Sequence, residues 1–168
     1  MEIRLPRDAL VVLVGPAGCG KSTFAARHFL PTQVVASDAC RALVSDDESN
    51  PASSRDAFAL MHLIIGMRLK RGRLTVADAT NVRAEKRGEL LEIARRHRRP
   101  AAAIVFELPE AVCQERNRAR GRVLPPQAIR AQLRGLRESL PRLADEGFSA
   151  VWVLHSAEET EAASVRIS

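Results

Sequence analysis

One stretch near the start of the chain limits the possible folds more than any other. The apolar run LVVLVG (10–15) leads directly into GPAGCGKS (15–22), and a helix-forming segment follows at about 21–29. A continuous apolar run of this kind is typical of a strand buried on both faces of a parallel sheet. The segment GPAGCGKS matches the phosphate-binding loop G-x-x-x-x-G-K-[ST] at every fixed position. This order predicts an α/β fold that binds phosphate groups.

Alternating strands and helices account for most of the remaining chain. We predict further strands at 33–36, 74–78, 101–108 and 150–155, and helices at 39–44, 56–71, 83–97, 109–119 and 126–145. This order predicts the phosphate-loop kinase type of fold, with a central parallel sheet of about five strands and helices on both faces. The tail from residue 156 opens a further helix and then stops. No repeat or long linker divides the 168 residues, so we predict one domain, 1–168, which can be a unit of a longer protein.

Composition narrows the partners and the compartment. The net charge of +6 favours acidic partners such as nucleotides or nucleic acid, although the excess of arginine over lysine can also arise from genome composition. Aromatic residues are scarce, which disfavours a stacking surface for single strands. No apolar run approaches the roughly 20 residues that cross a bilayer. The three cysteines are scattered and lack metal-type spacing, which fits a reducing cytosol. We therefore expect a cytoplasmic protein. The short apolar runs predict that it has no membrane partner.

The phosphate-binding loop assigns roles to its own residues. Backbone N–H groups and the helix N-terminus would surround the phosphates of ATP or another nucleoside triphosphate. Lys21 is expected to reach the β- and γ-phosphates, and the Ser22 hydroxyl to bind Mg²⁺ or Mn²⁺. We expect the Lys21 side chain to be partly exposed when no nucleotide is bound. The predicted ATP-binding residues of this segment are Gly15, Pro16, Ala17, Gly18, Cys19, Gly20, Lys21, Ser22 and Thr23.

Features of other phosphate-loop proteins are missing from the sequence. There is no Asn-Lys-x-Asp segment that would recognise guanine, and Asp78 is followed by Ala79, where ATPases that hydrolyse usually carry Glu. Nothing obvious therefore positions a water molecule for attack. This favours phosphoryl transfer to an acceptor supplied by a substrate.

Asp38 follows the strand predicted at 33–36, at the edge where open α/β sheets bind ligands. It can cap the helix at 39–44, as Ser37 can equally well, or accept the proton of an acceptor hydroxyl as general base. The two roles do not exclude each other. Arg41 is at i,i+3 and is expected on the same helix face, where its guanidinium suits a phosphate on the acceptor; a surface salt bridge is the alternative. We also include Asp38, with Ser22, among the predicted metal ligands.

The segment DATN (78–81) ends the third predicted strand. Asp78 can hold Mg²⁺ through water or brace Arg41. Asn81 can contact a substrate or cap the helix that follows. Both residues are predicted to bind the acceptor, together with Asp38 and Arg41.

The segment ERNRARGR (115–122) is an arginine cluster that follows the strand predicted at 101–108. Arg116 and Arg120 are at i,i+4 and are expected to share a helix face. A solvated basic face is one interpretation. The other is a helical lid that places arginines over the nucleotide and stabilises the transferring charge. We predict that Arg116 binds ATP, together with Arg120 or Arg122, and the sequence does not decide between these two.

These motifs together resemble the kinase domain of bacterial polynucleotide kinase–phosphatase, an end-healing enzyme of RNA repair. The resemblance covers nearly the whole chain, and the segment GRVLPPQAIR is shorter than the family pattern. Its most specific parts are SDACRALVSDDE and LPEAVCQERN. The segments that carry it are GPAGCGKSTFA, SDACRALVSDDE, GMRLKRGRLTVADATNV, IVFELPEAVCQERN and EGFSAVWVL.

The resemblance implies transfer of the γ-phosphate of ATP to a 5′-hydroxyl end of RNA or DNA. On that pattern Lys21 and Ser22 serve ATP and Mg²⁺, Asp38 is the general base, and Arg41 holds the acceptor. Arg116 and a following arginine contact ATP. The resemblance also implies phosphatase and ligase modules in a longer parent protein.

Two other functions stay open at this point. A small-molecule phosphotransferase would use the same chemistry on a sugar or an antibiotic, and a binding module would hold ATP without reaction. Arg41 and the net charge favour a polyanionic acceptor. The intact set of Lys21, Ser22 and Asp38 disfavours a pure binder. The choice between RNA and DNA, the donor nucleotide and the oligomeric state do not follow from the sequence.

Overall fold

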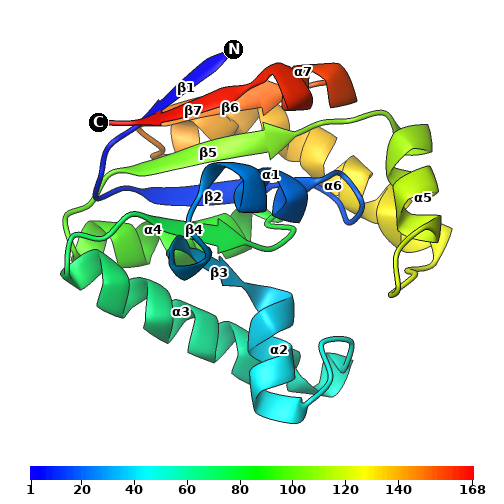
Figure 1. Ribbon diagram of the computed structural model, residues 1–168, viewed down its shortest axis with the longest axis horizontal. Coiled ribbons are helices and arrows are strands. Elements are labelled where there is room, and N and C mark those ends of the chain that lie inside the picture. The colour runs from blue at the N-terminus through cyan, green and yellow to red at the C-terminus, as the bar shows by residue number, and fades with distance from the viewer.

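Five parallel strands form the central sheet of the computed structural model, which describes residues 1–168 (Figure 1). The spatial order of the strands is β3-β4-β2-β5-β6, so β2 lies in the middle and pairs with β4 and β5. This confirms the predicted sheet, with strand ends within two residues of those expected. The strands are β2 (Leu10–Val14), β3 (Val34–Ala36), β4 (Thr75–Asp78), β5 (Ala101–Phe106) and β6 (Ala150–Leu154).

Helices cover both faces of this sheet, as predicted (Figure 1). None of them is both long and apolar enough to span a bilayer. The α-helices are α1 (Lys21–His28), α2 (Ser37–Ser45), α3 (Ser54–Lys70), α4 (Ala84–Arg96), α5 (Glu110–Arg118), α6 (Pro126–Leu143) and α7 (Ala157–Ala162), and short 3₁₀ turns lie at Pro31–Gln33, Pro51–Ser53 and Ala144–Glu146.

The alternation of side chains along β2 produces two cores. Val11 points into one core, where it packs with Phe24 of α1. Val12 points into the other, with Ile65 of α3 and Leu90 of α4. Because neighbouring strand residues point to opposite faces, a strand of this kind must be apolar throughout. This is why the run before the phosphate-binding loop carries no polar residue.

A second, two-stranded parallel sheet joins β1 (Glu2–Leu5) to β7 (Ser164–Ile167), and the sequence analysis missed it. Ile3 and Leu5 of β1 are fully buried, whereas the alternate residues Glu2 and Arg4 are exposed. The tail does open a helix, α7, as expected, but it then continues into β7. Strands of four residues give almost no periodic signal, and these two form only by pairing with each other.

The structure excludes two of the capping alternatives and one expected helix face. Helix α2 begins at Ser37, directly after β3, and neither Ser37 nor Asp38 caps it with a side chain. Helix α4 begins only at Ala84, so Asn81 does not cap it. Helix α5 ends at Arg118, which leaves Arg120 in the turn beyond it and not on a face shared with Arg116. The first cap is absent because strand and helix follow each other without a loop residue.

Candidate active site

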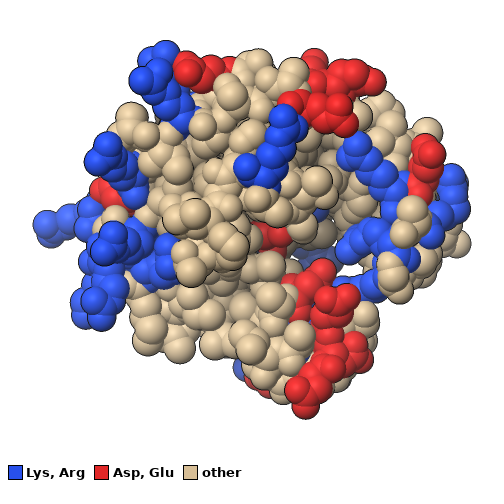
Figure 2. Space-filling model, in the orientation of Figure 1, with Lys and Arg blue, Asp and Glu red and all other residues tan.

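A cleft of about 860 Å³ opens where the central strands end, and residues from the phosphate-binding loop, α2 and the β4–α4 connection line it. This edge is where open α/β sheets bind ligands, and the size suits a small-molecule site, for which about 300–1,000 Å³ is usual. Figure 2 shows the cleft as a hollow between two charged regions. Basic side chains gather over α5 and the segment after it, and acidic side chains over α2 and its following loop.

Packing against two helices shapes the phosphate-binding loop in advance. Gly18 has a φ of +79°, and a Cβ at this position would lie 2.6 Å from the carbonyl oxygen of Cys113 in α5, so only glycine fits. The N–H of Ala17 donates to Oε1 of Gln132 in α6 at 2.8 Å. No motif in the sequence marks Gln132 as a residue of the site. The loop is therefore held in shape before any phosphate arrives.

Lys21 is buried, with an exposed fraction of 8%, so the expectation of a partly exposed side chain is wrong. Its ammonium group folds back into the loop and donates to the carbonyl oxygens of Gly15 at 2.9 Å and Pro16 at 2.8 Å. A buried charge needs such partners when no anion is present. The ammonium group is thus already beside the space that the loop encloses.

Ser22 and Asp78 form a pair between α1 and the end of β4. The Ser22 hydroxyl donates to Oδ2 of Asp78 at 2.7 Å. Burial raises the pKa of Asp78, and the hydrogen bond from Ser22 and the charge of Lys21 partly oppose that rise. A hydroxyl and a carboxylate are hard oxygen ligands, and Mg²⁺ commonly uses one or two protein ligands together with water and phosphate oxygens. The pair therefore fits a magnesium ion carried with a nucleotide.

Asp38 and Arg41 lie on one face of α2, as the sequence predicted. Nη1 of Arg41 is 2.5 Å from Oδ1 of Asp38, and Nε of Arg41 donates to Oγ of Ser54 at 3.1 Å. The Arg41 side chain is 12% exposed and the Asp38 side chain 41%, so a fixed guanidinium supports an accessible carboxylate. Ser54 of α3 fills the bracing role suggested for Asp78, which bonds Ser22 instead. The metal role of Asp38 stays a prediction.

The arginine-bearing segment after α5 is tied at its base by a single side chain. Nδ2 of Asn117 donates to the carbonyl oxygen of Leu124 at 2.7 Å, and the N–H of Leu124 donates back to Oδ1 of Asn117 at 3.0 Å. Asn117 is itself buried. Residues 119–123, which we call the lid loop after the predicted lid, therefore leave and rejoin the body of the protein at one fixed point.

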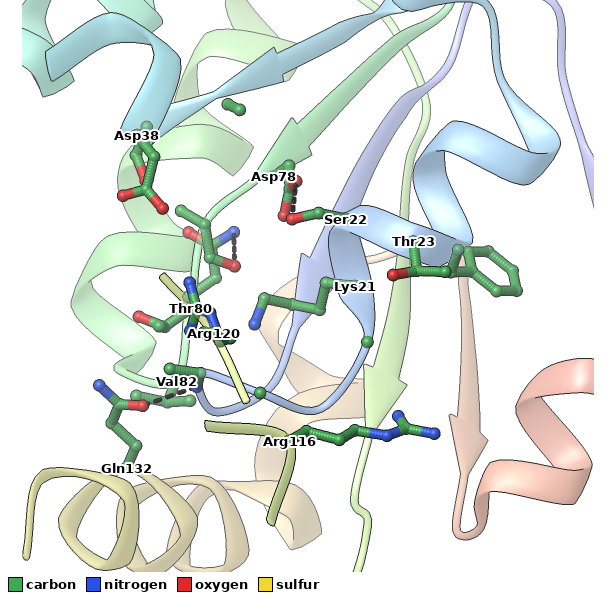
Figure 3. Close-up of a pocket in the computed structure, with 18 of the residues that line it drawn as sticks. Lys21, Ser22, Thr23, Asp38, Asp78, Thr80, Val82, Arg116, Arg120 and Gln132 are labelled. Carbon is green, nitrogen blue, oxygen red and sulfur yellow. Dashed lines mark hydrogen bonds between the residues drawn. The ribbon is translucent and has the colours of Figure 1, made fainter. Parts of the chain in front are cut away.

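Two of the cluster arginines lie toward the phosphate-binding loop. Nη1 of Arg116 donates to the carbonyl oxygen of Cys19 at 3.3 Å. Figure 3 shows Arg120 and Lys21 directed into the same space, near the Ser22–Asp78 pair. The charge of Arg120 contributes to lowering the pKa of Asp78, against the dominant effect of burial. Both positions are compatible with contacts to the phosphates of a nucleotide.

Arg122 lies on the other side of the cleft. Its Nη1 is 3.1 Å from Oδ1 of Asp38 and 3.4 Å from the carbonyl oxygen of Glu48. The lid loop thus reaches from the phosphate-binding loop to the predicted general base. Arg120 and Arg122, which the sequence did not separate, have different neighbours.

Asn81 has a structural position that the sequence did not predict. It is buried with a φ of +48°, and its Nδ2 donates to the carbonyl oxygen of Leu13 at 2.8 Å. Its own carbonyl oxygen accepts from Nη1 of the buried Arg87 at 2.9 Å. Asn81 therefore fixes the segment after β4 against β2. Its contact with an acceptor stays a prediction.

Several residues of the cleft belong to no motif. They come from α3, from the start of α4 and from α7, and the topology alone brings them to the site. Their only advance signal was the charge, hydroxyl group or aromatic ring of single residues, which is too common to select them. Those residues are Phe58, Arg83, Lys86, Thr160 and Glu161.

Comparisons with known proteins agree with the fold and the phosphate-binding loop described above. The model of a family described as an AAA domain matches residues 10–143. The chain belongs to this family. No curated protein matches the sequence.

Among solved structures, the chain is similar to one in the structure of the Pnkp1/Rnl/Hen1 RNA repair complex, with a TM-score of 0.70 and 25% identity. The match covers 83% of this chain and 47% of the other, so the chain spans about half the length of that relative. It confirms the resemblance inferred from the motifs.

Two further structures share the fold. A sugar kinase from Janibacter sp. has a TM-score of 0.60 and 20% identity, with 89% of this chain and 86% of the other covered. A gluconokinase from Sinorhizobium meliloti has a TM-score of 0.56 and 19% identity, with coverages of 92% and 90%. The family and the fold support a nucleotide-binding phosphotransferase of the phosphate-loop kinase type.

Proposed function

We propose that the protein transfers the γ-phosphate of ATP to the 5′-hydroxyl end of RNA or DNA. The observation that carries this proposal is the position of Asp38. Its carboxylate is held by Arg41 and lines the same cleft as Lys21 and the Ser22–Asp78 pair. A phosphate-binding loop, a magnesium-type pair and an accessible base in one cleft are what transfer to a hydroxyl requires.

The donor would lie along the phosphate-binding loop. Loop N–H groups and Lys21 would neutralise the β- and γ-phosphates, with Arg116 and Arg120 adding positive charge from the lid side. Ser22 and Asp78 would hold Mg²⁺, which supplies charge neutralisation at the phosphates. When a nucleotide binds, the ammonium group of Lys21 would exchange its hydrogen bonds to the carbonyl oxygens of Gly15 and Pro16 for the stronger attraction of a phosphate.

The acceptor would enter on the Asp38 side. Its 5′-oxygen attacks the γ-phosphorus, the bond from that phosphorus to the β–γ bridging oxygen breaks, and ADP leaves. Asp38 takes the proton of the hydroxyl as the new bond forms. Arg41 and Arg122 both lie against Oδ1 of Asp38, which leaves Oδ2 of the same carboxylate to take the proton.

Arg41 and the repair-complex relative favour a nucleic-acid end over a sugar. A guanidinium fixed beside the base suits a phosphate next to the reacting nucleoside, because arginine binds phosphate oxygens well. The relative at 25% identity belongs to an RNA repair complex. We extend the proposal to the parent protein: residues 1–168 act as its kinase domain in the cytoplasm, beside phosphatase and ligase modules.

The decisive assay combines the protein with γ-labelled ATP, Mg²⁺ and matched 5′-OH RNA and DNA oligonucleotides. Label on the 5′ end, lost with EDTA, is the expected result. Gluconate, other sugars and free nucleosides are tested in parallel as acceptors. Label on a sugar and not on any oligonucleotide would overturn the proposal in favour of a small-molecule kinase.

A further inference from the structure

Three helices bring an aromatic ring and two cations together in the cleft. Phe58 of α3 has Cζ of Arg41 at 5.8 Å from its ring centroid and Nζ of Lys86 at 5.7 Å. Arg41 belongs to α2 and Lys86 to α4, and all three residues line the cleft that holds the reaction centre. Both cations lie within the roughly 6 Å at which a ring face attracts a positive charge. The ring thus forms a bridge between the residue beside the base and a second positive charge.

The local partner of Lys86 is a weak one. Its Nζ donates to the two carboxylate oxygens of Glu89 at 3.1 and 3.4 Å, and the side chains of the pair are 36% and 37% exposed. An exposed pair of this kind contributes little to stability, so a phosphate oxygen can replace the carboxylate at little expense. The chain has only three lysines, Lys21, Lys70 and Lys86. Two of these three line the cleft, which an ordinary surface pair does not explain.

The spacing suits a nucleic-acid backbone. Because the two cationic groups each lie within 6 Å of the same ring centroid, they are less than 12 Å apart. Successive phosphates of one strand lie about 3.4 Å apart along the axis of a duplex and farther apart in an extended strand. A strand with one phosphate at Arg41 can therefore place a later phosphate at Lys86 while passing over the ring.

We propose that Lys86 binds a backbone phosphate of the acceptor strand, downstream of the phosphate at Arg41, with the strand lying across Phe58. The inference rests on the proposed function and adds the reason why a polynucleotide would be preferred over a mononucleotide. Lys86 is a specificity-determining residue in this arrangement. It takes no part in the chemical step, so it acts on acceptor affinity and not on turnover.

The test compares Lys86→Gln with the wild type and with Lys70→Gln, the same change at an exposed lysine outside this cleft. Steady-state kinetics use 5′-OH acceptors of increasing length, from a nucleoside 3′-monophosphate to a decanucleotide. We expect Lys86→Gln to raise the KM for the decanucleotide about fivefold, with kcat and the KM for the nucleoside 3′-monophosphate unchanged. In a plot of log affinity for the oligonucleotide against log salt concentration, the slope should become less steep by about 0.7. This is the change expected when one phosphate contact on a single strand is lost.

Removing the competing carboxylate provides an independent arm. Glu89→Gln frees Lys86 and should lower the KM for the decanucleotide, the opposite direction to Lys86→Gln. A Lys86→Gln variant that matches Lys70→Gln in both KM and salt slope overturns the inference, as does a KM increase that is equal for every acceptor length.

A binding measurement separates this inference from the proposed function. Fluorescence anisotropy with a labelled 5′-OH decanucleotide reports affinity even if no phosphate is transferred. If the wild type phosphorylates none of the acceptors, the proposed function fails. The Lys86 inference is then supported by weaker binding of Lys86→Gln than of Lys70→Gln, and is overturned if the two bind equally.

Discussion

Arg122 and Asp38 form an ion pair across the cleft, with Nη1 of Arg122 3.1 Å from Oδ1 of Asp38. The two residues are 84 positions apart in the sequence, so the pair joins the lid loop to α2. Arg120, two residues earlier, is directed instead toward the space beside Lys21 (Figure 3). The lid loop therefore places one arginine on the donor side and another against the predicted base.

The two lid arginines should differ in kinetics. We expect Arg120→Ala to raise the KM for ATP by about tenfold or more, since it removes positive charge beside the phosphates. Arg122→Ala should change the KM for ATP less and alter the KM for the 5′-OH acceptor, because Arg122 occupies the acceptor side. Steady-state titration of both substrates measures this. A larger ATP effect for Arg122→Ala would make Arg122 the second donor arginine.

Lys21→Met should abolish phosphoryl transfer while keeping most of the apolar stem that packs in the loop. The ammonium group neutralises charge that grows at the phosphates in the transition state, and methionine cannot replace it. Turnover is measured at saturating ATP, with circular dichroism as the check of folding. More than a tenth of wild-type turnover in a folded variant would exclude this role.

Asp38→Asn should lower turnover by about 10²–10⁴-fold, the usual contribution of a positioned base. Because Asp38 caps no helix in the structure, the variant should keep the wild-type melting temperature within a few degrees. Calorimetry should give nearly normal ATP affinity. If 5′-OH ends are still phosphorylated at near the wild-type rate, the base lies elsewhere, and Asp78 is the next candidate.

Asp78→Asn should make the ligand-free protein more stable at neutral pH and impair magnesium-dependent ATP binding. Burial raises the pKa of Asp78, so between the ordinary and the raised value the folded state binds more protons than the unfolded state. Stability therefore falls as pH rises through that interval, and the penalty is complete above it. Asparagine removes the penalty, and a gain of about 1 kcal/mol corresponds to roughly 2–4 °C in Tm.

The measurement for Asp78→Asn is thermal unfolding at neutral pH and at a pH below the ordinary carboxyl pKa. The gain should vanish at the lower pH, where Asp78 is protonated in both states. A Tm below that of the wild type at neutral pH would show that the charged form is favoured in the folded protein.

Glu146→Gln should be strongly destabilising. Glu146 accepts from Nε and Nη2 of Arg87 at 2.7 and 2.6 Å, and the Arg87 side chain is fully buried. Removing the carboxylate leaves a buried cation without a counter-charge, which costs about 3–5 kcal/mol in comparable pairs. Urea unfolding measures it, with Glu92→Gln of the exposed Arg95–Glu92 pair as control, expected to change stability by about 0.5 kcal/mol or less. Equal effects in the two variants would contradict the expectation.

How much the sequence reveals depends on whether the signal is local. The strand before the phosphate-binding loop and the loop itself are local patterns, and both were predicted correctly. The bracing of Arg41 by Ser54 and the anchoring of Ala17 by Gln132 depend on how helices pack, which no spacing rule contains. Phe58 and Lys86 lack a motif for the same reason.

The side-chain cap considered for α2 is absent for a different reason. A serine–aspartate pair after a strand is the usual start of a helix. Here β3 passes into α2 at once, so Ala36 occupies the capping position. The capping rule assumes that at least one residue connects the strand to the helix. No such residue lies between β3 and α2.

The pairing of β1 with β7 has a mechanical consequence. The two strands are parallel, with Glu2 opposite Ser164 and Leu5 opposite Ile167. Tension applied to the two ends of this segment pulls β1 and β7 in opposite directions along their length. The hydrogen bonds between them are then sheared together and cannot open one after another. Residues 1–168 should therefore resist stretching from their ends far better than strands of four residues suggest.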